Sequence, residues 1–252
     1  MNSGPPWPQA LLEVCLCSGA PTQLLIAGAL ALAGLRPGPE GEFSLVLLVS
    51  LTSLDTVILV GLVLTLLVAG GESPRQVLIG TRPIPGEVLR GFGLLIWVFV
   101  LFAVTAIVIA RWAPWLITPN PLATLASTRA EFVLLAVVAM IAGGLREEIQ
   151  RAFILHRCEQ RLGGLLGPVA RLAGLAVTPQ RERRLGAIAG LVGFGILFGL
   201  GHVVQGWSAV IITGLLGTLW GAVYLLRRSI VAPMVSHASF NLIEVIGFGL
   251  LA

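Results

Sequence analysis

The sequence predicts an all-α protein that folds as a polytopic bundle of transmembrane helices. Three observations support this class: 56% of the 252 residues are hydrophobic, only 11% are charged, and the mean hydropathy is +0.96. A soluble domain is about one half apolar and one quarter charged, so this chain has too little polar surface to face water on all sides. We therefore expect an integral membrane protein in contact with lipid.

Seven segments are long and apolar enough to cross a membrane, which takes about 20 residues for roughly 30 Å of hydrocarbon. In chain order they are 11–35, 43–69, 91–110, 130–156, 185–204, 208–226 and 230–251. The first is followed by a turn rich in proline and glycine, and the second by a glycine pair. We divide the chain into 1–129, whose spans have no assigned role, and 130–252, a core within the same bundle that carries most of the polar residues found inside spans.

The apolar piece 162–177 leaves an eighth span open. It is short, and Arg171 and four glycines interrupt it. It can form a helix lying in the membrane interface or a distorted span, and we favour the interfacial helix.

The arginines predict the orientation, because cytoplasmic loops carry an excess of basic residues. With the N-terminus inside, the inner loops hold eleven arginines (Arg75, Arg82, Arg90, Arg157, Arg161, Arg171, Arg181, Arg183, Arg184, Arg227 and Arg228) and the outer loops three (Arg36, Arg111 and Arg129). We expect a cytoplasmic N-terminus in a bacterial cytoplasmic membrane. The net charge of +4 then reflects topology, and we expect no nucleic-acid partner.

Polar groups inside spans are costly, so each is a candidate for function. The candidates are Asp55, Arg146, Glu147, Glu148, Arg151, His156, His202, His237, Asn241 and Glu244. In the fourth span Arg151 follows Glu147 by four residues and Glu148 by three, within ion-pair reach of either. The alternative reading is a charged helix end at the cytoplasmic boundary.

The other candidates lie in the fifth and seventh spans. His202 follows Gly199 and Gly201, which would let a neighbouring helix approach closely. His237 and Asn241 are four residues apart and share a helix face, and Glu244, seven residues beyond His237, can share it too. The structural alternative for His237 and Asn241 is a patch of interhelical hydrogen bonds worth about 1 kcal/mol.

Taken together, the three motifs resemble the CPBP family of intramembrane proteases (CAAX protease and bacteriocin-processing). The family pattern is a Glu-Glu pair followed by Arg, then Phe-x3-His, then His-x3-Asn, here Glu147-Glu148…Arg151, Phe198…His202 and His237…Asn241. The resemblance covers roughly 130–248. One residue fewer than usual separates the glutamates from Arg151, which shifts that side chain by about 100° around the helix.

The resemblance implies roles for these residues. Glu147 would be the general base that activates water, with His202 beside it, and His237 and Asn241 would donate to the oxyanion. Glu148 and Arg151 would orient Glu147. No cofactor is favoured, but a zinc ion held by Glu147, His202 and His237 remains an alternative, since two histidines and one glutamate form a known catalytic zinc set.

The expected substrate is a membrane-associated or prenylated protein or a leader peptide, and the rival reading is an inactive scaffold or immunity-type protein with the same fold. Asp55 is expected to pair with an arginine of the catalytic half or to stay protonated. His202 lies seventeen residues past Leu185, which suggests the outer half of the membrane unless its helix begins well outside.

Overall fold

All regular elements in the described residues, 6–39, 42–172, 174 and 178–251 of this computed structural model, are helices. The all-α prediction is therefore confirmed. Six helical stretches of the described residues are long and apolar enough to cross a membrane: Trp7–Leu32, Leu45–Ala69, Ile84–Trp112, Pro179–Leu200, Trp207–Arg227 and Val231–Gly249. The chain is an integral membrane protein.

The α-helices are α1 (Trp7–Leu16), α2 (Ala20–Leu32), α3 (Leu45–Ala69), α4 (Pro74–Leu78), α5 (Ile84–Trp112), α6 (Arg129–Ala139), α7 (Glu148–Arg157), α8 (Gly163–Leu172), α9 (Pro179–Leu200), α10 (Trp207–Arg227) and α11 (Val231–Leu251). Short 3-10 turns are η1 (Pro114–Leu116), η2 (Pro121–Thr124) and η5 (Val203–Gln205), and two π-helical segments are η3 (Met140–Glu147) and η4 (Cys158–Leu162).

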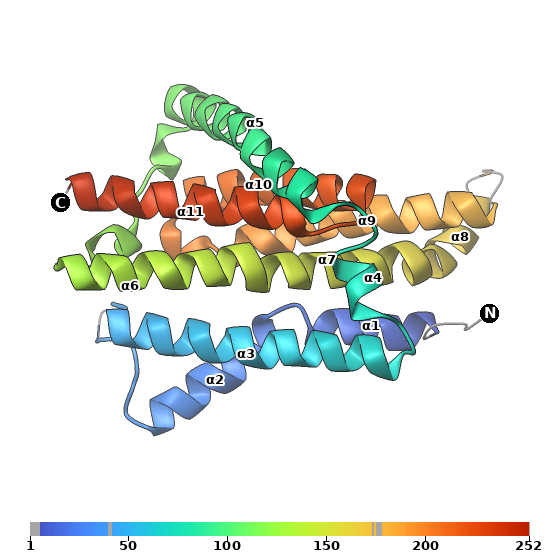
Figure 1. The fold of residues 1–252 in the computed structure, drawn as a ribbon, viewed down its shortest axis with the longest axis horizontal. Coiled ribbons are helices and arrows are strands. Elements are labelled where there is room, and N and C mark those ends of the chain that lie inside the picture. The colour runs from blue at the N-terminus through green and yellow to red at the C-terminus, as the bar shows by residue number, and fades with distance from the viewer. Residues whose placement is uncertain (1–5, 40–41, 173, 175–177, 252) are drawn as a thin grey trace.

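The predicted fourth span is part of one long helix that runs from α6 through η3, α7 and η4 into α8 (Figure 1). Because the middle of this helix is charged, the helix is not among the six apolar spans. Gly163 to Leu172 continue this helix and do not form the separate interfacial element that we predicted; 173 and 175–177 lie outside the described residues. The glycines here do not break the helix. They allow close packing, since a Cβ on Gly163 would meet the Glu182 backbone of α9.

The first span is two helices instead of the single predicted one. Gly19 has a φ of +91°, a conformation that glycine adopts without the strain of a side chain, and Pro21 then starts α2. Figure 1 shows α2 turning away from the direction of α1. The break exposes backbone carbonyls inside the protein, where the side chain of Gln150 from α7 reaches one of them.

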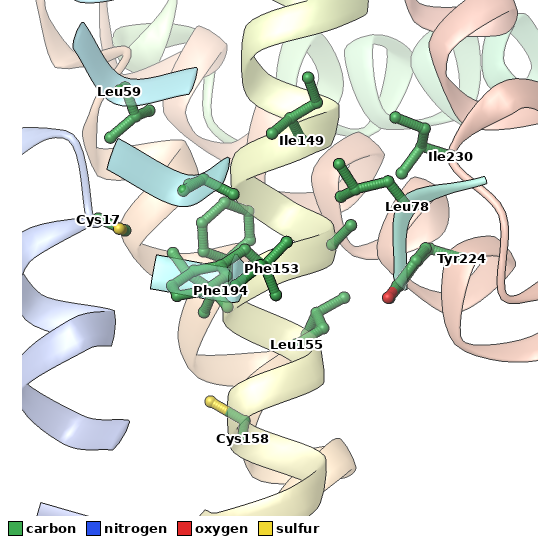
Figure 2. Close-up of a cluster of buried hydrophobic side chains, with 14 of the residues drawn as sticks. Cys17, Leu59, Leu78, Ile149, Phe153, Leu155, Cys158, Phe194, Tyr224 and Ile230 are labelled. Atoms are coloured by element: carbon green, nitrogen blue, oxygen red, sulfur yellow. The ribbon is translucent and has the colours of Figure 1, made fainter. Parts of the chain in front are cut away.

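The core surrounds α7. Figure 2 shows Phe153 and Leu155 of α7 between side chains of several other helices. The residues buried with them come from α3, α4, α9 and α10, and include Leu59, Leu78, Phe194 and Tyr224. Because α7 is covered on all sides, the charged residues along it are held in fixed positions.

The bundle has two ends that differ in composition. The arginine-rich end holds the start of α1, the end of α3, α4, the end of α8, the start of α9, and the turn between α10 and α11. The arginine-poor end holds η1, η2, the start of α6, η5 and the end of α11. Helix α9 begins at Pro179, six residues earlier than predicted, and with α8 extends past the neighbouring helices (Figure 1). The sequence suggested that His202 lies in the outer half of the membrane unless its helix begins early. The early start of α9 is that exception.

Candidate functional site

A cavity of about 430 Å³ lies between α6, η3, α9, α10 and α11. The predicted residues Glu147, His202, His237, Asn241 and Glu244 all line it. Much of the remaining wall is apolar, with phenylalanines contributed by α5, α9 and α11. Three helices far apart in sequence therefore bring their polar side chains to one apolar-walled space.

His237 is held by a buried chain of charges. Its Nδ1 donates to Glu148 Oε1 at 2.8 Å, and Arg151 forms an ion pair with the same carboxylate. Glu148 and Arg151 are 1% and 0% exposed. We expected this pair to orient Glu147; in the structure its contacts hold the ring of His237 instead. The shortened spacing places Arg151 three residues after Glu148, on the same face of α7.

Glu147 faces the other nitrogen of the same ring. Its Oε2 lies 3.6 Å from His237 Nε2, and its side chain is 18% exposed. The two glutamates therefore approach His237 from opposite sides, one fully buried and one open to the cavity. The neighbouring backbone permits this approach, because a Cβ on Gly143 would lie 3.1 Å from His237 Nε2.

Asn241 is fixed by the backbone of the helix that carries Glu147. Its Nδ2 donates to the Ala139 carbonyl at 3.0 Å, at the point where α6 gives way to the π-helical η3. An amide nitrogen carries two hydrogens, so one donor of Asn241 remains for a ligand. A π-helical segment inside an α-helix is frequent at functional sites.

His202 sits just past the end of α9. Its Nδ1 donates to the Phe198 carbonyl at 2.8 Å, which leaves Nε2 as the nitrogen without a backbone partner. The His202 ring packs on Phe198 with centroids 4.9 Å apart, and Phe198 in turn meets the edge of His237 at 6.3 Å. Phe198 thus separates and positions the two histidines.

Trp220 is a site residue that the sequence analysis missed. Its ring stacks on His237 with centroids 3.9 Å apart and an angle of 17°, and its Nε1 donates to Ser236 Oγ at 3.3 Å. The guanidinium of Arg151 lies over the rings of Phe198 and Trp220, at 4.7 and 5.6 Å. A signal existed, since tryptophan in membrane helices favours the interfaces and Trp220 lies well inside its span.

Residues 129–243 match the family model of the Rce1-like type II CAAX prenyl endopeptidases. We call this region, which is similar to that family, the Rce1-like domain. The match contains all three motifs and confirms the resemblance drawn from them. Comparisons with curated proteins and with solved structures found no match.

The zinc alternative would place Glu147, His202 and His237 of the Rce1-like domain around one ion. In the described part of the chain, no three His, Cys, Asp or Glu side chains come close enough together to hold a metal ion. The Nδ1 bonds of His237 to Glu148 and of His202 to a backbone carbonyl leave Nε2 as the nitrogen that each ring could offer to a metal. As placed, Glu147, His202 and His237 do not form a zinc site.

A buried polar network ties the Rce1-like domain to the first two spans. Arg146 Nη2 pairs with Asp55 Oδ2 at 2.6 Å, which confirms the expected pairing of Asp55. Thr22 Oγ1 donates to the same aspartate at 2.6 Å, and Gln150 Nε2 donates to the Cys17 carbonyl at 2.7 Å, at the break between α1 and α2. The helix that carries Glu147 is thus anchored one residue before it.

A second network lies nearer the arginine-rich end. Arg157 Nε donates to Glu13 Oε2 at 2.6 Å and Nη1 donates to Glu72 at 2.7 Å, while His156 Nε2 lies 3.0 Å from Glu72. Burial works against the charge of Glu72, but the hydrogen bonds from His156 and Arg157 outweigh it and hold the pKa of Glu72 below its ordinary value. His156, a candidate without a role, is therefore a structural partner here.

Proposed function

We propose that this protein is an intramembrane endopeptidase of the CAAX-protease type, which hydrolyses peptide bonds of membrane-associated or prenylated proteins or of leader peptides. One observation carries the proposal. Glu147 Oε2 and His237 Nε2 lie 3.6 Å apart at the wall of an apolar cavity, and Glu148 holds the other nitrogen of His237. This is the arrangement that a water molecule needs to be deprotonated beside a hydrogen-bond donor.

In this mechanism Glu147 takes a proton from water as the oxygen attacks the carbonyl carbon of the substrate. The carbonyl oxygen becomes an oxyanion, which accepts hydrogen bonds from the remaining N–H of Asn241 and from His237 Nε2 in its imidazolium form. Collapse of the intermediate breaks the C–N bond, and Glu147 returns its proton to the leaving amine. His202, through its unbonded Nε2, would help to place the water.

The chain would lie in the membrane with its N-terminus in the cytoplasm. The support is the arginine distribution, because eleven arginines lie at the arginine-rich end with the N-terminus and three at the other end.

The test compares the wild type with Glu147→Gln in proteoliposomes, using quenched peptides with and without a prenyl group. Glu182→Gln, which removes a carboxylate of α9 far from the cavity, serves as the matched control. We expect cleavage by the wild type and the control, and none by Glu147→Gln. An active Glu147→Gln variant rejects the mechanism, and silence from all three proteins favours the scaffold reading.

A chelation experiment separates the two catalytic types. Cleavage that survives exhaustive chelation supports the glutamate mechanism, whereas cleavage that is lost and returns only with zinc supports a metalloprotease.

A further inference from the structure

The catalytic cavity extends toward one end of the bundle only. Its lining includes Thr118 and Asn120 from the connection between α5 and α6, Gln205 of η5 and Ser208 in the first turn of α10. All of these lie at the arginine-poor end. None of the lining residues belongs to a loop of the arginine-rich end.

The distance along α11 gives the depth of this opening. Phe248 near the end of α11 and His237 both line the cavity and are eleven residues apart, about 16 Å along a helix. The cavity therefore runs from the arginine-poor surface down to the proposed catalytic histidine.

The opposite direction is closed by packed side chains. Below His237 lie Trp220, which is 1% exposed, and the buried pair Glu148 and Arg151. The apolar cluster around α7 continues this seal toward the arginine-rich end (Figure 2). A peptide coming from that end would have to displace a buried ion pair and a packed core.

Loops rich in arginine stay in the cytoplasm, and the count of basic residues decides this more than the net charge does. The arginine-rich end is therefore the cytoplasmic end, and the cavity mouth lies on the other side.

We propose that substrates enter the cavity from the non-cytoplasmic face, and that the substrate is a protein segment exposed on that face beside the membrane. That a substrate is cleaved in the cavity rests on the proposed endopeptidase function. The direction of access rests on the cavity and the arginines alone. It places the reaction after export of the substrate across the membrane, and so favours leader peptides and other exported segments among the proposed substrates over proteins prenylated in the cytoplasm.

The first experiment measures access without using activity. Cys15, Cys17 and Cys158 are replaced by alanine, and single cysteines are introduced as Ser208→Cys in the cavity lining and Arg183→Cys in α9 at the arginine-rich end. Intact expressing cells are treated with a membrane-impermeant maleimide. We expect labelling of Ser208→Cys from outside and of Arg183→Cys only after the cells are permeabilised; the reverse pattern overturns the proposal.

The second experiment measures the side of cleavage with the wild-type protein. An impermeant quenched peptide is added to right-side-out and to inverted membrane vesicles, and detergent then opens both. We expect cleavage by right-side-out vesicles before detergent and by both afterwards; faster cleavage by sealed inverted vesicles overturns the proposal. If neither preparation cleaves even in detergent, the endopeptidase function fails, and the labelling pattern alone decides the direction of access.

Discussion

At the scale of single residues, Glu148 decides which nitrogen of His237 faces the cavity. Its carboxylate accepts from Nδ1, so Nε2 is left toward Glu147. Glu148→Gln puts a neutral amide there, which no longer stabilises the positive charge that His237 needs in order to donate from Nε2. We expect kcat to fall by about 10²-fold or more with KM little changed, as for loss of a positioned acid or base.

This prediction is checked by steady-state kinetics beside a melting curve in detergent, because Arg151 loses its partner in the variant. Glu148→Asp, which keeps the charge, should recover part of the activity. A folded Glu148→Gln enzyme with wild-type kcat would contradict the role.

Glu244 is the second residue whose charge has a testable effect. It lines the cavity together with Glu147, and no arginine of the described residues does so. The cavity should therefore favour peptides with a basic residue near the scissile bond over acidic ones. Glu244→Gln should reduce the ratio of kcat/KM between the basic and the acidic peptide by about tenfold, or roughly 1.4 kcal/mol at partly screened distances. An unchanged ratio would show that Glu244 lies too far from the bound peptide.

At the scale of residues, the sequence predicted the ionisable side chains that line the cavity. The motifs led to the set that lines one cavity, since charged residues in apolar spans have few other reasons to be there. Trp220 escaped notice because its one signal, a position well inside the span, does not say which residue it contacts until its neighbour His237 is known. The contact of Glu148 with His237 likewise joins residues 89 positions apart, which no spacing rule relates.

At the scale of elements, the π-helical η3 shapes the site through its missing side chain at Gly143. A Cβ there would collide with the Asn241 amide and approach His237 Nε2. Gly143→Ala should therefore move both donors and lower kcat by about 10²-fold, as misplacement by about 1 Å can do. Gly247→Ala in α11 is the matched control, because nothing lies within 4 Å of its added Cβ.

Cleavage rates of the two glycine variants, with helical content from circular dichroism, check this prediction. Equal activity in both would mean that η3 can shift without cost.

The ends of the helices were harder to predict than the helices. Hydropathy locates an apolar run but does not register a break such as the one at Gly19, because the residues on either side are equally apolar. The glycines of 162–177 suggested an interruption, whereas they permit α8 to pack against α9. Whether a glycine interrupts a helix or lets it pack closely depends on the partner helix, and the glycine spacing alone does not identify that partner.

At the scale of the whole molecule, Asp55 and Arg146 join the two halves of the chain through a pair that is about 4% and 8% exposed. Removing one partner leaves a buried charge alone, so Asp55→Asn should cost about 3–5 kcal/mol of stability. The double variant Asp55→Asn with Arg146→Gln should melt higher than Asp55→Asn, because both charges are then gone. Melting curves in detergent check this order, and a double variant less stable than either single one would contradict it.

The contacts of Glu72 with Arg157 and His156 make the stability of the folded protein depend on pH. The folded pKa of Glu72 is held below its ordinary value of 4.5, so its stabilising effect is complete above that value and is lost as the pH falls through the folded pKa. Glu72→Gln should therefore lower the melting temperature at neutral pH, and the difference from the wild type should shrink below pH 4.5. A difference that stays constant down to acidic pH would mean that the Glu72 charge is not involved.

The bond from Asn241 to the carbonyl of Ala139 has a consequence for how such a site can evolve. The acceptor belongs to the backbone, so no substitution at 139 other than one that distorts the helix can remove it. Substitutions at position 139 therefore leave this hydrogen bond almost unchanged, whereas substitutions at Asn241 remove it. Comparing the side chains of related sequences would show one half of this interaction and hide the other, and the importance of residue 139 becomes visible only in three dimensions.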